Sequence, residues 1–187
     1  MIEYEELDIA GVYLFSFPLF SDERGIFREW FKKEYMESKV GRSLDVIQSN
    51  VSSSIKGTAR GIHYSLDQGS QWKIVTCVHG AISDFIVDTF PNSATFGKTV
   101  RVDLNSNDNK VLFIPGGLGH GFFAKEDSVV TYSIGSGYSP EFEKEINIVD
   151  LKLNLIREEE IQFISKKDKD AMSLDEALTA RLLPDWR

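Results

Sequence analysis

The chain has 187 residues, with a hydrophobic share of 42%, an aromatic share of 12% and a formal net charge of −8 at pH 7. These values are typical of a globular protein with a sizeable core, and we expect a single domain over residues 1–187. The acidic balance argues against a protein that binds nucleic acid through a general basic surface. A local group of basic side chains can still bind a small anionic ligand.

The sequence predicts a cytoplasmic protein. Its single cysteine, Cys77, allows no disulfide within the chain, which is typical of reducing compartments. Because Cys77 lies in an apolar run, we expect it to be a small buried hydrophobic residue. The first residues have neither the basic region nor the apolar stretch of a secretion signal, and no apolar run approaches the ~20 residues of a membrane span.

The N-terminal part predicts a few strands and one short helix. Val12–Phe15 is apolar on both faces and ends before a proline, as expected of a buried strand. The polar stretch Ser21–Gly25 ends in glycine and predicts a turn. After this turn we expect a strand over Ile26–Phe31, a helix over Lys32–Lys39 and a strand over Asp45–Ser54.

The central part predicts an all-β fold. From Thr58 to Tyr138, short apolar segments alternate with turn signals such as Pro91-Asn92. Regular short strands with this spacing are typical of a β sandwich or barrel. No amphipathic helical window of useful length occurs between Lys56 and Pro140, so we exclude a doubly wound α/β fold.

The C-terminal part is rich in charged residues. Asn147–Ile156 predicts one more strand, whereas the runs Arg157–Glu160 and Lys166–Asp170 are typical of a solvated surface. The stretch Ser173–Glu176 has the spacing of a capping box and predicts a helix that continues to about Arg181.

Four titratable side chains, Arg60, His63, Lys73 and Asp84, lie close together in sequence, in segments that predict strands. A charged group that faces the interior of a sheet must be paired or functional, because burying an unpaired charge is costly. Four of them in neighbouring strands predict a pocket lined by an acid, a base and cations.

Several motifs occur along the chain in a fixed order: Asp22-Glu23-Arg24-Gly25, Gln48-Ser49-Asn50, Arg60-Gly61-Ile62-His63-Tyr64, Lys73, Asp84 with Val87-Asp88, Ser93-Ala94-Thr95-Phe96-Gly97, and Ile114-Pro115-Gly116-Gly117-Leu118-Gly119-His120-Gly121-Phe122. Together they resemble the family of dTDP-4-dehydrorhamnose 3,5-epimerases. The similarity extends from about Leu7 to Trp186. Each motif alone is a weak signal, but the ordered set is specific.

The resemblance implies a fold, a substrate and an assembly. Members of this family have a cupin-type β jelly roll and act on dTDP-4-keto-6-deoxyhexoses in deoxysugar biosynthesis. They form homodimers and use neither a metal nor an organic cofactor, so we expect the same of this chain.

Epimerisation beside a ketone needs a base that removes the α-proton, an electrophile that holds the enolate, and an acid that protonates the opposite face. Imidazole titrates near neutrality, so His63 suits the base, and the resemblance implies this role. It also implies that Asp168 orients His63, that Lys73 stabilises the enolate and that Tyr132 donates the proton. Without the family, His63 and Tyr132 would be read as structural residues, and Lys73 and Asp168 as surface charges.

The resemblance also implies a set of substrate contacts. Arginine suits a diphosphate because its planar guanidinium forms two parallel charge-assisted hydrogen bonds. The implied contacts are Arg24, Glu29, Gln48, Ser49, Asn50, Arg60, His120, Tyr138, Glu143 and Lys167.

Two details qualify the match. Strict strand alternation puts Arg60 and His63 on opposite faces, so we expect a bulge or a strand end between them. The chain also has Phe90 where the family usually carries an arginine, and Ser133 where a lysine often follows the tyrosine. These departures leave open which hexose is bound and whether C3, C5 or both are inverted.

Two other functions compete with an epimerase. A metal-dependent cupin, such as a dioxygenase or isomerase, fits the Pro115-x-Gly117-x-x-His120 motif, but the first cupin motif needs a His-x-His pair where this chain has only His63. A non-catalytic module that binds a sugar nucleotide explains the arginines but not the set of catalytic candidates. We therefore expect no metal site and prefer the epimerase.

Overall fold

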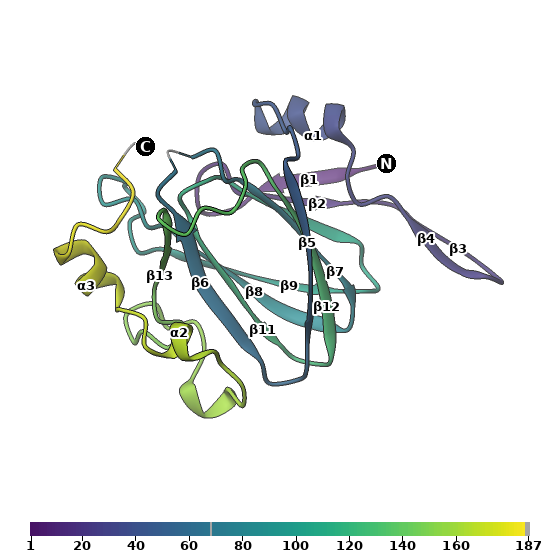
Figure 1. Cartoon of the computed structure of the whole chain (residues 1–187). Coiled ribbons are helices and arrows are strands. Elements are labelled where there is room, and N and C mark those ends of the chain that lie inside the picture. The colour runs from purple at the N-terminus through teal and green to yellow at the C-terminus, as the bar shows by residue number, and fades with distance from the viewer. Residues whose placement is uncertain (68, 186–187) are drawn as a thin grey trace.

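A computed structural model describes residues 1–67 and 69–185 of the chain. Most of it is antiparallel β structure, with short helices near the N-terminus and at the C-terminus (Figure 1). The strands are β1 (Glu3–Glu6), β2 (Tyr13–Ser16), β3 (Leu19–Asp22), β4 (Gly25–Arg28), β5 (Gln48–Ser54), β6 (Ala59–Ser65), β7 (Lys73–His79), β8 (Ala81–Val87), β9 (Thr99–Asn105), β10 (Lys110–Ile114), β11 (Gly119–Ala124), β12 (Ser128–Ile134) and β13 (Glu143–Glu145). The helices are α1 (Lys33–Val40), the 3-10 helix η1 (Glu158–Glu160), α2 (Lys166–Lys169) and α3 (Leu174–Thr179).

Two sheets face each other and form the predicted β sandwich. One sheet has the strand order β1-β2-β10-β7-β12-β5, and the other has the order β13-β6-β11-β8-β9. Among the described residues, strands β3 and β4 pair only with each other, and Figure 1 shows this hairpin projecting away from the rest of the molecule. Strand β5 is an edge strand, and an exposed sheet edge offers unpaired backbone groups to a partner.

Three apolar clusters hold the sandwich together. The first lies between the sheets and joins residues such as Val75 and Val130 of one sheet to Ile86 of the other. The second covers the outer face of the five-stranded sheet with the C-terminal segment, including α3. In the third, Met36 of α1 packs against the six-stranded sheet. The second cluster matters most for the site, because it anchors the segment that carries α2.

A bulge separates Arg60 from His63, as the sequence predicted. Strand β6 pairs with β11 at His63↔His120 and again at Arg60↔Phe122, so β6 advances by three residues where β11 advances by two. Gly61 occupies this bulge with φ +96°, and a Cβ there would lie 2.6 Å from the carbonyl oxygen of His120. Only glycine allows this close approach, which brings both side chains to the same cavity.

The structure corrects three predictions for single elements. The strand predicted over Ile26–Phe31 ends at Arg28, and the strand predicted over Asp45–Ser54 begins at Gln48. Asn147–Ile156 forms turns and no strand, and its apolar side chains pack on the outer face of the five-stranded sheet.

The charge run Lys166–Asp170 is exposed, as its composition indicated, with one exception. Lys166–Lys169 form α2, and Asp168 within this helix is buried. The predicted helix after Ser173 is confirmed as α3, with its capping box to Glu176, although it ends at Thr179. In the described part of the chain, no helix is long and apolar enough to cross a membrane.

Candidate active site

A cavity of about 710 Å³ opens between the two sheets. Strands β5, β7 and β12 form one wall, and β6, β11 and β13 form the other, with α2 at the side. Eleven of the fourteen predicted site residues line it: Gln48, Asn50, Arg60, His63, Lys73, His120, Tyr132, Tyr138, Glu143, Lys167 and Asp168. The fold therefore gathers residues that lie more than a hundred positions apart in sequence.

His63 of β6 forms a close pair with Asp168 of α2. Nε2 of His63 lies 2.6 Å from Oδ1 of Asp168. The imidazole remains partly open to the cavity, with 41% of its side chain exposed, whereas the carboxylate is 6% exposed. Because Nε2 is engaged, Nδ1 is the ring nitrogen left to act as a base.

Several contacts fix Asp168 in place. Ser165 caps the short helix α2 by accepting a hydrogen bond from the backbone N–H of Asp168. Oδ2 of Asp168 also accepts a hydrogen bond from the backbone N–H of Gly61, at 3.4 Å. Burial raises the pKa of the Asp168 carboxyl, but the hydrogen bonds that it accepts, above all the one with His63, have a larger effect in the opposite direction. The net result is a lowered pKa. Asp168 is therefore ionised at neutral pH and holds the imidazole in one orientation.

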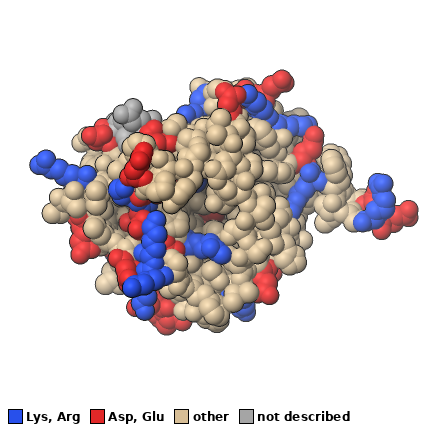
Figure 2. All heavy atoms as spheres, in the orientation of Figure 1, with Lys and Arg blue, Asp and Glu red and all other residues tan. Residues whose placement is uncertain are grey.

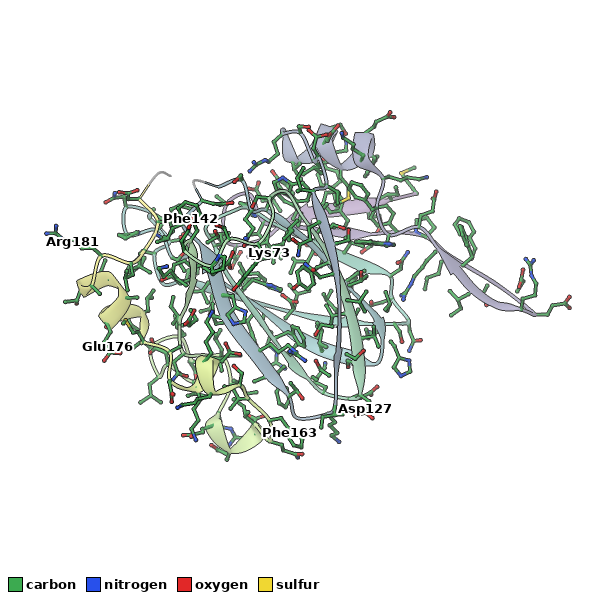
Figure 3. The ribbon with its side chains drawn as sticks, viewed as in Figure 1. Lys73, Asp127, Phe142, Phe163, Glu176 and Arg181 are labelled. Atoms are coloured by element: carbon green, nitrogen blue, oxygen red, sulfur yellow. The ribbon has the colours of Figure 1, made fainter. Side chains whose placement is uncertain are left out.

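Lys73 is buried and not a surface lysine. It begins β7, is 8% exposed and lies in the space between the two sheets (Figure 3). Burial lowers the pKa of its ammonium, while the charges of Glu143, Asp67 and Asp84 act in the opposite direction. A partly desolvated ammonium of this kind can stabilise a developing negative charge more strongly than one in water.

Tyr132 lies on the wall opposite His63. It is in β12, next to β7, and Ile134 two residues later pairs in register with Lys73. Burial raises the pKa of its phenol, so the hydroxyl keeps its proton at neutral pH. Tyr132 and His63 thus approach a ligand in the cavity from opposite sides.

A second histidine–carboxylate pair lies beside the first. His120 of β11 pairs in register with His63, and its Nε2 lies 3.0 Å from both carboxylate oxygens of Asp84. His120 lines the cavity, whereas Asp84 is fully buried beneath it. Burial raises the pKa of the Asp84 carboxyl, and the charges of His120 and Lys73 oppose this effect.

Basic side chains gather at the opening of the cavity, where Figure 2 shows Lys and Arg atoms in blue near the centre of this face. The Arg60 guanidinium donates to Oγ of Ser54 and to the backbone carbonyl of Ser53. Lys167 forms an ion pair with Glu145 at 3.0 Å. Such a group of cations can bind a diphosphate in an otherwise acidic protein.

Polar residues of β5 and a tyrosine from the loop between β12 and β13 also line the cavity. Nε2 of Gln48 donates to Oδ1 of Asn50, as expected for two residues on one face of a strand. Tyr138 lies at the mouth, and its backbone N–H donates to Oε1 of Gln48. Ser49 points to the other face of β5, where its hydroxyl lies 2.8 Å from that of Ser133, and it does not line the cavity.

Arg24 and Glu29 also lie outside the cavity. Arg24 is at the tip of the β3–β4 hairpin, where it forms an ion pair with Asp22. Glu29 follows β4 and forms an ion pair with Lys32. Within the described chain, these two residues therefore do not meet the other predicted contacts.

Several residues that line the cavity were not among those predicted. Gln71 is buried and donates from Nε2 to Oε1 of Glu143 at 2.6 Å. Phe122 and Val130 form an apolar part of the lining. Their alternation with His120 and Tyr132 in the same strands could have indicated them, since residues i and i+2 share a face. Among the described residues, no group of three His, Cys, Asp or Glu side chains is arranged to hold a metal ion.

Known proteins resemble this chain over nearly all of its length. A family model described as dTDP-4-dehydrorhamnose 3,5-epimerase matches residues 6–176. The dTDP-4-dehydrorhamnose 3,5-epimerase of Mycolicibacterium smegmatis is 38% identical over 182 residues, which cover 97% of this chain and 90% of the relative.

Solved structures show the same fold. NovW, a 4-keto-6-deoxy sugar epimerase from the novobiocin biosynthetic gene cluster of Streptomyces spheroides, has a TM-score of 0.95 at 32% identity, covering 100% of this chain and 94% of that chain. A dTDP-6-deoxy-D-glucose-3,5-epimerase from Legionella pneumophila, solved in complex with dTDP-4-keto-L-rhamnose, has a TM-score of 0.91 at 32% identity and covers 100% of both chains.

These similarities confirm the cupin-type jelly roll predicted from the motifs. The family match also spans every residue that lines the cavity, from Gln48 to Asp168. By sequence, by fold and by the extent of both matches, the chain belongs to the dTDP-4-dehydrorhamnose 3,5-epimerase family.

Proposed function

We propose that this chain is a nucleotide-sugar epimerase that inverts C3, C5 or both in a dTDP-4-keto-6-deoxyhexose during deoxysugar biosynthesis. The observation that carries the proposal is the 2.6 Å pair of His63 and Asp168 on one wall of a cavity whose other wall presents Lys73 and Tyr132. Family membership supports the substrate class, because the Legionella relative was solved with a dTDP-4-keto sugar.

The four side chains can carry the whole reaction. Nδ1 of His63 removes the proton from the carbon beside the ketone, and the electrons of the C–H bond move into the enolate. The Lys73 ammonium stabilises the negative charge on the enolate oxygen. Tyr132 then donates its proton to the same carbon from the opposite wall, which inverts the centre. This sequence uses no metal and no organic cofactor.

The nucleotide occupies the opening of the cavity. Arg60 and Lys167 bind the diphosphate there, and Gln48 and Asn50 offer amide groups to the rest of the nucleotide. Glu143, held by Gln71, lies near the sugar, and its charge opposes the lowering of the Lys73 pKa that burial causes. The cytoplasmic location stays a prediction from the sequence.

A second copy of the chain completes the site. The β3–β4 hairpin projects from the molecule and exposes Phe20, Ile26 and Phe27. The edge strand β5 exposes Val51 beside the cavity. Packing the hairpin of one copy on β5 of the other covers both apolar surfaces and brings Arg24 and Glu29 to the nucleotide.

The dimer can be tested apart from the chemistry. Phe27→Asp places a charge in the proposed contact, and sedimentation analysis of this variant should give a monomer where the wild type gives a dimer. Lys152→Asp, which changes an exposed residue on the C-terminal side, is the control and should leave the wild-type mass. A monomeric wild type contradicts the dimer.

The activity is tested by incubating the wild type with dTDP-4-keto-6-deoxyglucose in deuterated water and locating the deuterium by NMR. We expect deuterium at C3, C5 or both, together with inverted product, also after exhaustive chelation. The absence of exchange at either carbon contradicts the epimerase and favours a binding module. Activity that disappears with a chelator and returns with one divalent metal favours a metal-dependent cupin.

A further inference from the structure

Asp84 is a completely buried carboxylate beneath the cavity, and the mechanism above does not use it. It is in β8 with an exposed fraction of 0%, and it does not line the cavity itself. Two residues that interact with it, His120 and Lys73, do line the cavity. Asp84 therefore connects the buried core to two side chains that meet a ligand.

We propose that Asp84 is a positioning residue for the epimerisation, which fixes the imidazole of His120 toward the sugar and supplies a buried negative charge to Lys73. The proposal rests on the proposed function, because it assigns Asp84 a part in that reaction. It concerns a residue that does not touch the substrate and acts only through the two that do.

The geometry selects one tautomer of His120. Nε2 lies 3.0 Å from each oxygen of Asp84 and forms its hydrogen bond with Oδ2, so the proton of the neutral ring is on Nε2 and is donated to that oxygen. Nδ1 is then the nitrogen left to accept a hydrogen bond from a sugar hydroxyl. Without the carboxylate, the ring could take either tautomer. In the Nδ1–H tautomer, Nδ1 is a donor and can no longer accept a hydrogen bond from the hydroxyl.

Asp84 also affects the charge of Lys73. Three carboxylates act on this ammonium: Glu143 of β13, Asp67 after β6, and Asp84 of β8. Of these, Asp84 is the one that is fully buried, and its Oδ1 has no hydrogen-bond partner among the described residues. A negative charge in so dry a place interacts strongly with a neighbouring cation, because water does not screen it. It favours the protonated form of Lys73, which is the form that stabilises an enolate.

A purely structural role does not account for this arrangement as well. The cost of removing two charges from water offsets most of their attraction, so a buried ion pair adds little net stability. An apolar pair at these positions would support the sandwich equally well. What the carboxylate adds is an orientation and a charge, and both are directed at residues of the cavity.

Two substitutions separate these two contributions. Asp84→Asn keeps an oxygen that accepts from Nε2 of His120 but removes the charge. We expect kcat about tenfold lower with a nearly unchanged KM, and a kcat–pH profile whose alkaline limb moves to lower pH as Lys73 loses its proton more easily. Asp84→Leu removes the hydrogen bond as well, so KM should also rise. Asp103→Asn, on the neighbouring strand β9, changes an exposed carboxylate and should leave all three quantities unchanged.

Folded Asp84→Asn and Asp84→Leu variants with wild-type kcat, KM and pH profile overturn the proposal. An inactive wild type would instead contradict the proposed function. If both variants fail to fold, NMR of the wild type labelled with ¹⁵N-histidine tests the proposal. The His120 signal is identified as the one that is missing from the spectrum of His120→Gln. We expect this signal to report the Nε2–H tautomer. An Nδ1–H tautomer of His120 overturns the proposal.

Discussion

Two histidine–aspartate pairs lie at the cavity, and their surroundings give them different properties. His63 and Asp168 join strand β6 to the C-terminal helix α2, and the imidazole is 41% exposed. His120 and Asp84 join two neighbouring strands, β11 and β8, and the imidazole is 11% exposed. The histidines are register partners, so the two pairs stand side by side.

The difference in exposure suits the two pairs to the different roles proposed for them. A base must accept a proton and then release it, which requires access to the reacting carbon and to solvent. The His63 pair has this access. The His120 imidazole is far less exposed, and its Asp84 partner is sealed under the cavity away from solvent, so this pair suits a fixed arrangement. Histidine next to a carboxylate is therefore not by itself the mark of a base.

The largest expected effect comes from removing the base. His63→Asn should lower kcat by about 10²-fold or more, the order expected for the loss of a general base, while the protein stays folded. The matched control is His79→Asn, because His79 is exposed at the end of β7 and outside the cavity. Steady-state kinetics on dTDP-4-keto-6-deoxyglucose measures both. A folded His63→Asn enzyme with near-normal kcat would show that His63 is not the base.

Tyr132→Phe tests whether the second pair can replace the acid. His120 is on the same sheet as His63, so it cannot protonate the face opposite the base. We therefore expect the variant to form epimer about 10²-fold more slowly, yet still to incorporate deuterium into recovered substrate, because His63 still forms the enolate. NMR in deuterated water measures exchange and inversion together. An unchanged epimer yield would disprove the donor role of Tyr132, and Tyr138 at the mouth would be the next candidate.

Asp168→Asn should have a smaller effect than the loss of His63. The amide fits the same space and can still contact Nε2, but it has no charge to stabilise the imidazolium that forms when His63 takes the proton. We expect kcat to fall about tenfold, with KM changed much less. The ratio of kcat between Asp168→Asn and Asp84→Asn then compares the two pairs directly. A wild-type kcat for Asp168→Asn would mean that His63 needs no carboxylate.

The sequence predicted the sandwich and most of the cavity but not the difference between the two pairs. Short strands and turn signals depend on local chemistry, so the all-β core was predictable from them. The bulge at Gly61 followed from strand alternation, since Arg60 and His63 could share a site only if one residue was inserted. The position of Asp168 was implied only by resemblance, because nothing local shows that a lysine-rich run will bury one carboxylate.

Two further differences between prediction and structure have a physical reason. Arg24 and Glu29 lie outside the cavity of the described chain, and a motif read along one chain does not show where its residues lie in space. The segment Asn147–Ile156 has an apolar content like that of a strand. Its apolar side chains instead pack on the outer face of the five-stranded sheet, and apolar content alone does not distinguish a strand from a packed loop.

The smallest expected effect concerns stability, and its sign distinguishes the pairs. The pKa of Asp168 is lowered in the folded protein, so its ionised form adds stability above the ordinary carboxyl pKa, and this is lost as pH falls below about 4. The pKa of Asp84 is raised by burial, so its contribution is fully present below about pH 4 and is lost as pH rises. Replacing either residue by asparagine removes the pH dependence that this residue contributes to stability.

Urea unfolding from about pH 3 to about pH 5.5 should therefore show two opposite trends in the free energy of unfolding. The excess stability of the wild type over Asp168→Asn should grow with pH, and its excess over Asp84→Asn should shrink. Both changes should stay within about 1–3 kcal/mol. Equal slopes for the two variants would mean that the two carboxylates have the same environment and that burial does not separate their roles.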